Sequence, residues 1–515
     1  MTKWFEKLRL VAIGTLIWGG SLSAQGPDVV WSRTYGGAKE DRGHSVHQTS
    51  DSGYIVVGRT RSFGPGYPDI FLVKTDQNGD SLWTRRYGGS HWEWGNGVQQ
   101  TYDGGYIIVG GTRSFGIATP ARANVYLVKT NANGDTIWTK TYGGSGYERG
   151  YSVQQTSDGG YIVAAYTTSF GEGAESVWLL RADVNGDTNW TRTYGADTTL
   201  SRAYSVQQTS DGGYIVTGEN TCVNADVYVI RTDSAGDTLW TRTYGGPDCD
   251  IGYSVRQTLD GGYVVAGCTY SFGTGTPDHC NFYVVKTDST GDTLWTQTCG
   301  GDYDDHSYSV QQTSDGGYIS TGYRDDSSSV YLVKIDVNGD TIWTKSFGGG
   351  GSEVGYSVEE TVDGGYIIAG YTDSFGSGGY DVYLIKTAPD VGVEADVSVA
   401  KPLFICYARP NPFRCRTLIQ YTLPRGSAVR LALYNLLGEE IKTLIDQDQD
   451  AGLHTVIWDA TDGAGRKVSS GAYFLRLSTQ SVESCRSRDG VGTGEAHRGL
   501  ARRGCTGALK VCVVR

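Results

Sequence analysis

The chain has 515 residues, of which 75 are glycine and 35 are tyrosine, and its formal net charge is −12. This acidic balance argues against a nucleic-acid ligand, which needs a basic surface, and leaves cations, glycans and proteins as candidate partners. No apolar run is long enough to cross a bilayer, so no transmembrane segment is expected.

The first 24 residues predict a secretory signal peptide that is cut near Ala24. Three basic residues, at positions 3, 7 and 9, precede an apolar run from Leu10 to Trp18, and small residues follow. The alternative is a buried N-terminal strand or helix. No cysteine directly follows the predicted cut, so no lipoprotein anchor is expected.

A repeat of about 50 residues occupies the chain up to Thr387, and a repeat with this period is typical of propellers and solenoids. Each unit has one anchor tryptophan and one tyrosine that follows a Gly-Gly turn. The tryptophans are Trp31, Trp83, Trp138, Trp190, Trp240, Trp295 and Trp343. The tyrosines are Tyr54, Tyr106, Tyr161, Tyr214, Tyr263, Tyr318 and Tyr366. Both series count seven.

Each unit predicts four short antiparallel strands, which read YSVQQT, GGYIVVG, YLVKTD and TxWTRTYGG. These runs are rich in β-branched and aromatic residues, and the turns SDGG and NGD separate them. Asn-Gly pairs such as Asn78-Gly79 suit a hairpin turn with positive φ. Four antiparallel strands per unit predict the blade of a β-propeller.

The two ends of the repeat predict how the ring closes. The seventh unit stops at Thr387 without a tryptophan strand, whereas the chain begins with an isolated one, Trp31 to Tyr35. Pairing of these two halves would leave no open sheet edge. We therefore predict an all-β chain in which residues 25–387 form a closed seven-bladed β-propeller, and we expect a monomer.

Function is predicted on the face that carries the variable loops, since the SDGG and NGD turns hardly vary and read as scaffold. Five positions before the valine of YSV, six of seven units carry a carboxylate, and the fourth has Ser201. These acids are Asp41, Glu93, Glu148, Asp250, Asp305 and Glu353. One interpretation is an acidic ring at the channel mouth that binds calcium or a cationic ligand. The other is that each acid accepts hydrogen bonds from loop backbone or pairs with Arg42, Arg149 or Arg202.

Other residues of the repeat suggest weaker candidates. Trp92, Trp94 and Tyr147, on the variable face, could stack on sugar rings, whereas the repeat tryptophans read as core. The segment Asp76 to Asp80 misses the EF-hand spacing and is explained as a hairpin turn. It resembles the Asp-box turn of sialidase-type propellers with altered spacing, and that family's catalytic arginines and tyrosine cannot be assigned here.

Ten cysteines are compatible with export. Three disulfides are candidates: Cys268 with Cys280, Cys222 with Cys249, and Cys406 with Cys415. The spacings match no zinc-binding pattern, so no metal site and no resident cofactor are predicted.

A linker at 388–402 precedes a second pattern of strands and glycine turns at 403–479, which predicts a small immunoglobulin-like sandwich. Its marks are the PNPF opening at Pro410 to Phe413, Trp458-Asp459 and the SGAYF motif at Ser470 to Phe474. They resemble the C-terminal sorting domain of the bacterial type IX secretion system, which is similar in fold to the immunoglobulin-like domain of flagellar hook-capping proteins.

That resemblance implies recognition of residues 403–515 by an outer-membrane translocon. It also implies cleavage of this domain and a secreted or surface-attached product of a Gram-negative-type bacterium. The tail at 480–515 departs from the family, because residues 480–507 show no strand pattern and only Lys510 to Arg515 resembles the expected last strand.

Two functions remain. The first is an exported, non-catalytic propeller that binds a glycan, a protein or a cation. The alternative is a secreted glycan-degrading hydrolase, endoglucanase-like or sialidase-like, with an unassigned active site. Near-identical repeats favour the first, since an active site needs residues specific to one blade, and no G-x-S-x-G or H-E-x-x-H motif is present.

Overall fold

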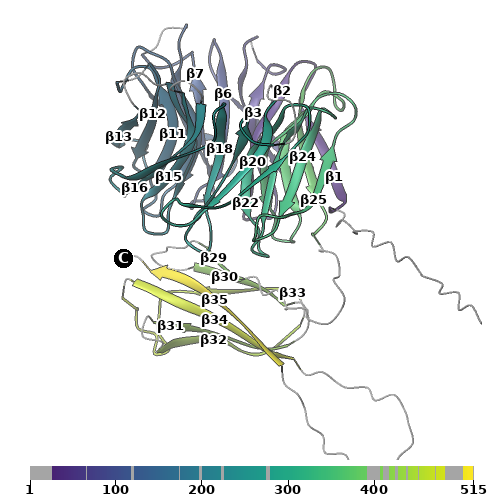
Figure 1. Cartoon of the computed structure of the whole chain (residues 1–515). Helices are drawn as coiled ribbons and strands as arrows, with labels where there is room; N and C mark the ends of the chain where they lie inside the picture. The colour runs from purple at the N-terminus through teal and green to yellow at the C-terminus, as the bar shows by residue number, and fades with distance from the viewer. Residues whose placement is uncertain are drawn as a thin grey trace, which may run out of the picture.

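The structure is a computed structural model that is all-β in the residues it describes. Figure 1 shows a ring of β-sheets and a smaller β-sandwich. The described residues are 26–64, 66–117, 121–172, 174–195, 200–221, 225–273, 279–390, 406–409, 417–423, 427–435, 439–450, 452–469, 471–481 and 503–513. Within them, no helix has the length and apolar content needed to span a bilayer.

Seven four-stranded antiparallel sheets form the ring, which confirms the predicted fold class. The first three blades contain β2 (Asp41–Gln48), β3 (Tyr54–Thr60), β4 (Asp69–Thr75) and β5 (Ser81–Tyr87); β6 (Glu93–Gln100), β7 (Tyr106–Thr112), β8 (Asn124–Thr130) and β9 (Thr136–Tyr142); and β10 (Glu148–Gln155), β11 (Tyr161–Thr167), β12 (Ser176–Ala182) and β13 (Thr188–Tyr194). The next three contain β14 (Leu200–Gln208), β15 (Tyr214–Thr221), β16 (Ala225–Thr232) and β17 (Thr238–Tyr244); β18 (Asp250–Gln257), β19 (Tyr263–Thr269), β20 (Asn281–Thr287) and β21 (Thr293–Cys299); and β22 (Asp305–Gln312), β23 (Tyr318–Arg324), β24 (Ser329–Ile335) and β25 (Thr341–Phe347).

The seventh blade closes the ring as predicted. Its sheet has the order β1-β28-β27-β26, formed by β26 (Glu353–Glu360), β27 (Tyr366–Thr372), β28 (Asp381–Thr387) and β1 (Val29–Tyr35). Ser32 pairs with Ile385, and Tyr35 pairs with Val382. The N-terminal strand therefore supplies the outer edge that the seventh unit lacks.

Side chains also stabilise this closure. The NGD turn that would cover Trp343 is absent from the seventh blade, and Gly26 lies against the indole ring in its place. The Trp343 Nε1 donates to Asp390 at 3.2 Å, and the Lys345 ammonium donates to the carbonyl of Pro27 at 2.7 Å. Residues from both ends of the propeller thus replace the missing turn.

The apolar core lies between neighbouring blades. Every described side chain of β4, β8 and β12 is buried, as expected for strands covered on both faces. Ile55 and Leu72 of the first blade pack in one cluster with Ile108 of the second. Each anchor tryptophan contacts the Gly-Gly tyrosine of the next blade, as Trp83 does with Tyr106 at 5.9 Å between ring centroids. The repeat tryptophans are therefore core residues, as predicted.

The second domain has two antiparallel sheets, of order β29-β30-β33 and β32-β31-β34-β35. Its strands are β29 (Cys406–Arg409), β30 (Thr417–Leu423), β31 (Ser427–Tyr434), β32 (Glu440–Gln449), β33 (Gly452–Trp458), β34 (Gly471–Ser481) and β35 (Arg503–Val513). Trp458 is fully buried in its core. The prediction that residues 480–507 contain no strand pattern is wrong at both ends, because β34 reaches Ser481 and β35 begins at Arg503.

Candidate functional site

A β-bulge recurs in the innermost strand of every blade, and it directs one side chain of each blade to the ring axis. In β2 the register shifts between Gly43 and Ser45, so the residue between them has no partner in β3. A bulge of this kind re-aims a side chain. The seven bulged residues, here called the axial belt, are His44, Asn96, Tyr151, Tyr204, Tyr253, Tyr308 and Tyr356.

The members of the axial belt contact one another around the axis. The rings of Tyr308 and Tyr356 lie 4.9 Å apart, and those of Tyr151 and Tyr204 lie 5.0 Å apart. Asn96 continues the belt, because its Nδ2 donates to the carbonyl of Gly150 at 2.6 Å. All seven side chains are half-buried. Sequence reasoning missed this belt, although the departures from tyrosine at positions 44 and 96 were a visible signal.

Three arginines surround one side of the belt. Arg42 and Arg59 are cross-strand partners on β2 and β3, and Arg149 lies on β10. The Arg42 guanidinium lies over Tyr371 at 4.4 Å, and that of Arg149 lies over Tyr151 at 5.0 Å. Among the described residues, none of the three arginines forms an ion pair with a carboxylate. We call Arg42, Arg59 and Arg149 the arginine cluster.

The positive charges of the cluster act on one another. Burial lowers the pKa of Arg59, the nearby charges of Arg42 and Arg149 lower it further, and the carboxylate of Glu40 opposes this shift in part. Burial also lowers the pKa of His44 to about 3, and the same three arginines contribute to this shift. His44 is therefore neutral at physiological pH. The Nε atoms of Arg42 and Arg149 are buried without a hydrogen-bond partner. The arrangement favours an anion.

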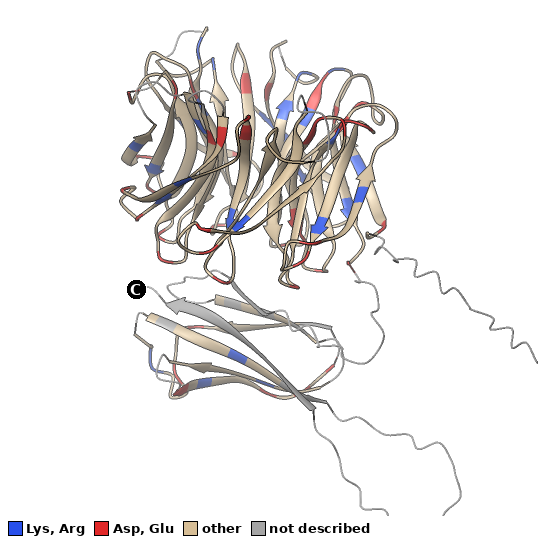
Figure 2. Cartoon of the chain, in the orientation of Figure 1, with Lys and Arg blue, Asp and Glu red and all other residues tan. Residues whose placement is uncertain are grey.

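The opposite side of the belt is internally neutralised. Arg202 pairs with Glu175 and, at 3.2 Å, with Glu219. The hydroxyl of Tyr204 donates to Glu219 at 2.8 Å. Among the described residues around the belt, cations without an ion pair therefore lie on the side of blades one to three, and Arg256 on β18 of the fifth blade also forms no ion pair. Figure 2 shows Lys and Arg on the strands of the ring and acidic residues in the turns along its lower rim.

The predicted sugar-stacking residues do lie together, beside the arginine cluster. Trp92 and Trp94 have ring centroids 6.0 Å apart, and Arg113 lies between Trp94 and Tyr147, at 5.5 Å and 5.8 Å from their rings. Trp94 is only 6% exposed, so its faces are already covered. Trp92 and Tyr147 keep part of their surface.

The predicted acidic ring is corrected by the structure. The six carboxylates begin the innermost strands as expected, but they are at most 1% exposed and do not line the axis. Glu93 accepts hydrogen bonds from the backbone N–H of Gly89 at 3.0 Å and the Thr112 hydroxyl at 2.8 Å. Asp41 accepts from Gly37 N–H at 2.8 Å, and Asp250 from Gly246 N–H at 2.8 Å. Hydrogen bonding to loops, the second interpretation, describes these acids, although Asp250 Oδ1 and Asp305 Oδ1 are buried without a hydrogen-bond partner.

The other candidate sites have mixed outcomes. In the D-x-N-G-D turn, the Asp76 carboxylate accepts the backbone N–H groups of Asn78 and Asp80, and Gly79 has a φ of 78°, as a hairpin requires.

Cys268 and Cys280 are free thiols in this structure, and Cys249 is free and exposed. Cys222, Cys415 and the side chain of Cys406 lie outside the described residues, so their two disulfides stay predictions.

A hollow of about 240 Å³ lies between the second and third blades. Its walls include Phe170, Trp178 and Leu180, and none of its lining residues is charged. It offers no group for catalysis and is not part of the candidate site.

Comparison with known proteins supports the second domain. Residues 416–482 match the model of the FlgD Ig-like domain. No curated protein sequence matches the chain. Solved structures with similarity include a fungal alcohol oxidase of the AA5 family in complex with copper, at 14% identity and a TM-score of 0.47 over 88% of this chain and 96% of that one. They also include the Pan2 WD40 domain of Neurospora crassa, at 11% identity and a TM-score of 0.42 over 69% and 91%, and a puromycin hydrolase, at 14% identity and a TM-score of 0.44 over 75% and 59%.

Proposed function

We propose that the chain is an exported, non-catalytic β-propeller that binds an anionic polysaccharide at the arginine cluster. The observation that carries the proposal is that, within the described residues, none of these three neighbouring guanidinium groups forms an ion pair with a carboxylate, and the Nε atoms of Arg42 and Arg149 have no hydrogen-bond partner. Like charges held together in a partly buried site repel one another more strongly than in water. An anion would remove this repulsion and would gain charge-assisted hydrogen bonds.

The chemistry around the cluster favours a sugar acid over a simple inorganic anion. Arginine presents a planar fork that matches a carboxylate in two-point geometry. Trp92 packs on Trp94, over which Arg149 of the cluster lies at 5.2 Å, and the exposed parts of such aromatic groups suit the apolar side of a sugar ring. A chain of uronic acids would place carboxylates on the arginines and sugar rings on these aromatics.

Binding of oligogalacturonate tests the proposal, with a neutral cello-oligosaccharide of equal length as the control ligand. We expect binding of the acidic chain alone, weakened by salt because the contact is electrostatic. The variant Arg59→Ala/Arg149→Ala should bind it about 10- to 100-fold more weakly. Arg192→Ala is the matched control, since Arg192 also lies over a tryptophan, at 5.7 Å, but on an outer strand. Equal binding by both variants would contradict the proposal.

Export is the second part of the proposal. The match of residues 416–482 to an immunoglobulin-like domain is consistent with a sorting signal. We propose that residues 1–24 direct the chain across the inner membrane. We also propose that a type IX translocon recognises residues 403–515 and delivers the propeller to the cell surface or the medium. Deletion of residues 403–515 should leave the propeller in the periplasm, as cell fractionation would reveal.

One candidate nucleophile for the hydrolase alternative is Tyr204 of the axial belt, whose hydroxyl donates to Glu219, because a tyrosine with an adjacent carboxylate can act as a nucleophile. Burial raises the pKa of Tyr204, and it raises that of Tyr356 to about 12, so both hydroxyls keep their protons at neutral pH. Release of reducing sugar by the purified chain, abolished in Tyr204→Phe, would favour the hydrolase over the binding protein.

A further inference from the structure

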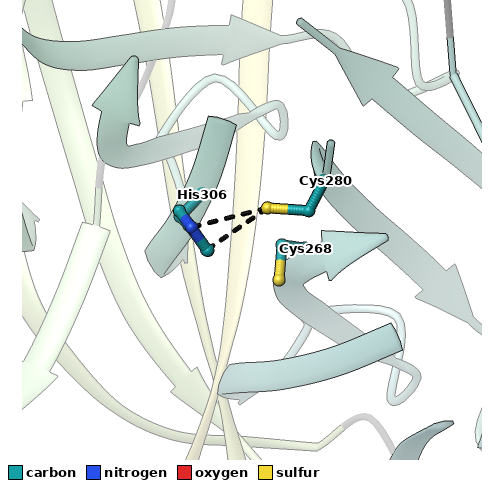
Figure 3. Close-up of side chains that lie close together, drawn as sticks. All are labelled: Cys268, Cys280 and His306. Atoms are coloured by element: carbon teal, nitrogen blue, oxygen red, sulfur yellow. Dashed lines mark hydrogen bonds between the residues drawn. The ribbon is translucent and has the colours of Figure 1, made fainter. Parts of the chain in front are cut away.

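Two cysteines and one histidine converge at the junction of the fifth and sixth blades. Cys268 lies on β19, Cys280 immediately precedes β20, and His306 lies on β22. Figure 3 shows the Cys280 thiol directed at the imidazole of His306, with the Cys268 thiol beside them. Their donor atoms all lie within 4.8 Å of one another. Both cysteines are fully buried and His306 is half-buried.

The register of the sheet does not favour a disulfide here. Cys268 pairs with Phe282 rather than with Cys280, so the two cysteines are diagonal neighbours, two residues out of register. Diagonal positions on antiparallel strands lie about 7–8 Å apart between Cα atoms. A disulfide needs Cα atoms closer than about 7 Å. A bridge would therefore require a shift of the backbone, whereas two thiolates sharing a metal would not.

One edge of the group, from Cys280 to His306, has the length expected in a tetrahedral metal site, although the sulfur lies at similar distances from both ring nitrogens. Bond lengths of about 2.3 Å to sulfur and about 2.0 Å to nitrogen place a sulfur and a nitrogen ligand about 3.5 Å apart across a tetrahedral edge. The Cys280 Sγ lies 3.4 Å from the His306 Nε2 and 3.6 Å from its Nδ1. Two thiolates and a divalent cation also sum to zero charge, which suits a buried position.

The backbone holds Cys280 in place from both sides. Its N–H donates to the Asp304 carboxylate at 2.9 Å, and its carbonyl accepts the N–H of Asp305 at 2.8 Å. The His306 ring stacks on Tyr308 at 5.5 Å between centroids. Ligands fixed by such neighbouring contacts need little reorganisation to bind a metal.

The combination is specific to one blade. The cross-strand pair Ile251 and Cys268 corresponds to Arg42 and Arg59 in the first blade and to Arg149 and Tyr166 in the third. Scaffold residues are repeated in all seven blades, whereas the residues of this cross-strand pair differ from blade to blade. A unique set of soft ligands among repeated elements indicates a local role.

We propose that Cys268, Cys280 and His306 bind a zinc ion, with the fourth coordination position open to water or a ligand. Both thiols lose their protons when the ion binds, and the ion accepts one electron pair from each sulfur and one from the imidazole. Zinc uptake should therefore release protons and strengthen as pH rises.

Metal titration of the full-length chain, reduced and stripped of metal, tests this site. The wild type should take up about one zinc ion per chain more than Cys268→Ser/Cys280→Ser. Cys249→Ser/Cys299→Ser is the matched control and should bind as the wild type, since neither of these free thiols belongs to the group of three converging donors. Zinc uptake by the double variant equal to that of the wild type would overturn the proposal.

Cobalt substitution keeps the test informative if the double variant folds poorly. The wild type should show thiolate-to-cobalt charge-transfer absorption. In His306→Asn, which changes only a half-buried side chain, the ligand-field bands should shift because one nitrogen ligand is lost. An identical cobalt spectrum in wild type and His306→Asn would exclude the imidazole and with it the three-ligand site.

Discussion

The two ends of each blade differ in what they repeat. At the turn end, every blade carries the same ion pair between a buried cation on the third strand and the aspartate of the Gly-Gly turn. The pairs are Lys74–Asp51, Lys129–Asp103, Arg181–Asp158, Arg231–Asp211, Lys286–Asp260, Lys334–Asp315 and Lys386–Asp363. At the loop end, the residues around the axial belt change from blade to blade. Uniform contacts indicate a role in stability, whereas blade-specific ones indicate a ligand.

The largest effect is expected at the turn end, in Asp315→Ala. Lys334 is 2% exposed in its side chain, so the substitution leaves a buried ammonium without its carboxylate. Loss of one partner of a buried pair costs about 3 kcal/mol, the lower end of the usual range because Asp315 is itself partly exposed. Urea unfolding measures the loss, and oligogalacturonate binding should be unchanged in the folded variant. A stability equal to that of the wild type would remove the distinction between the two ends.

The next effect is at the loop end, in Arg59→Ala/Arg149→Ala. Affinity for oligogalacturonate should fall about 10- to 100-fold, as expected when charge-assisted hydrogen bonds are removed. Because Arg59 is repelled by Arg42 and Arg149, the free energy of unfolding should stay constant or rise. Calorimetric titration and urea unfolding of the same sample separate the two properties. A marked loss of stability would make these arginines scaffold.

Acid pH should affect the two ends with opposite sign. Burial alone would raise the pKa of Asp51, but hydrogen bonds from Thr49 and Lys74 hold it below the usual value. A lowered pKa in the folded state adds stability above about pH 4, and this stability is lost as pH falls further. At the loop end, burial raises the pKa of Asp305 to about 6. The contribution of Asp305 to the free energy of unfolding is complete below about pH 4 and is lost as the pH rises through 6.

Asp305→Asn isolates the loop-end contribution. The amide cannot ionise, so the variant should gain about 2 kcal/mol relative to the wild type at pH 8 and nothing at pH 4. The expected gain in stability is smaller than the full pKa shift would give. The reason is that the Asp305 carboxylate accepts the N–H of Gly301 at 3.1 Å, and an amide oxygen forms this hydrogen bond less strongly. Thermal unfolding at the two pH values checks the sign. An equal effect at both would show that Asp305 does not titrate in this range.

The same contrast explains what the sequence could predict. Blade count, strand order and closure came from residues that repeat, because a period identifies every copy of the same contact. The predicted position of the six acids was wrong because a bulge between Gly43 and Ser45 directs His44, rather than Asp41, to the axis. The residue types alone do not reveal this bulge. Cys268, Cys280 and His306 come from three strands, so no linear spacing groups them.

The smallest predicted effect concerns one position of the outermost strand, which is a tyrosine in five blades but not in the other two. In five junctions a tyrosine hydroxyl donates to a glycine carbonyl of the next blade's NGD turn, as Tyr244 does to Gly291 at 2.7 Å. Cys299 stands at this position in the fifth blade. Cys299→Tyr should add the missing bond to Gly339 and about 1 kcal/mol of stability in urea unfolding.

Phe347 provides the control for that substitution. It occupies the tyrosine position of the sixth blade, and the seventh blade has no NGD turn, because β1 replaces the segment that would follow β28. A hydroxyl there would find no turn carbonyl, so phenylalanine suits the site. Phe347→Tyr should therefore bring no gain, and at 6% exposure its added hydroxyl should cost stability if it stays unpaired. Equal gains from both substitutions would mean that ring size, rather than the bond to the next blade, explains the tyrosines.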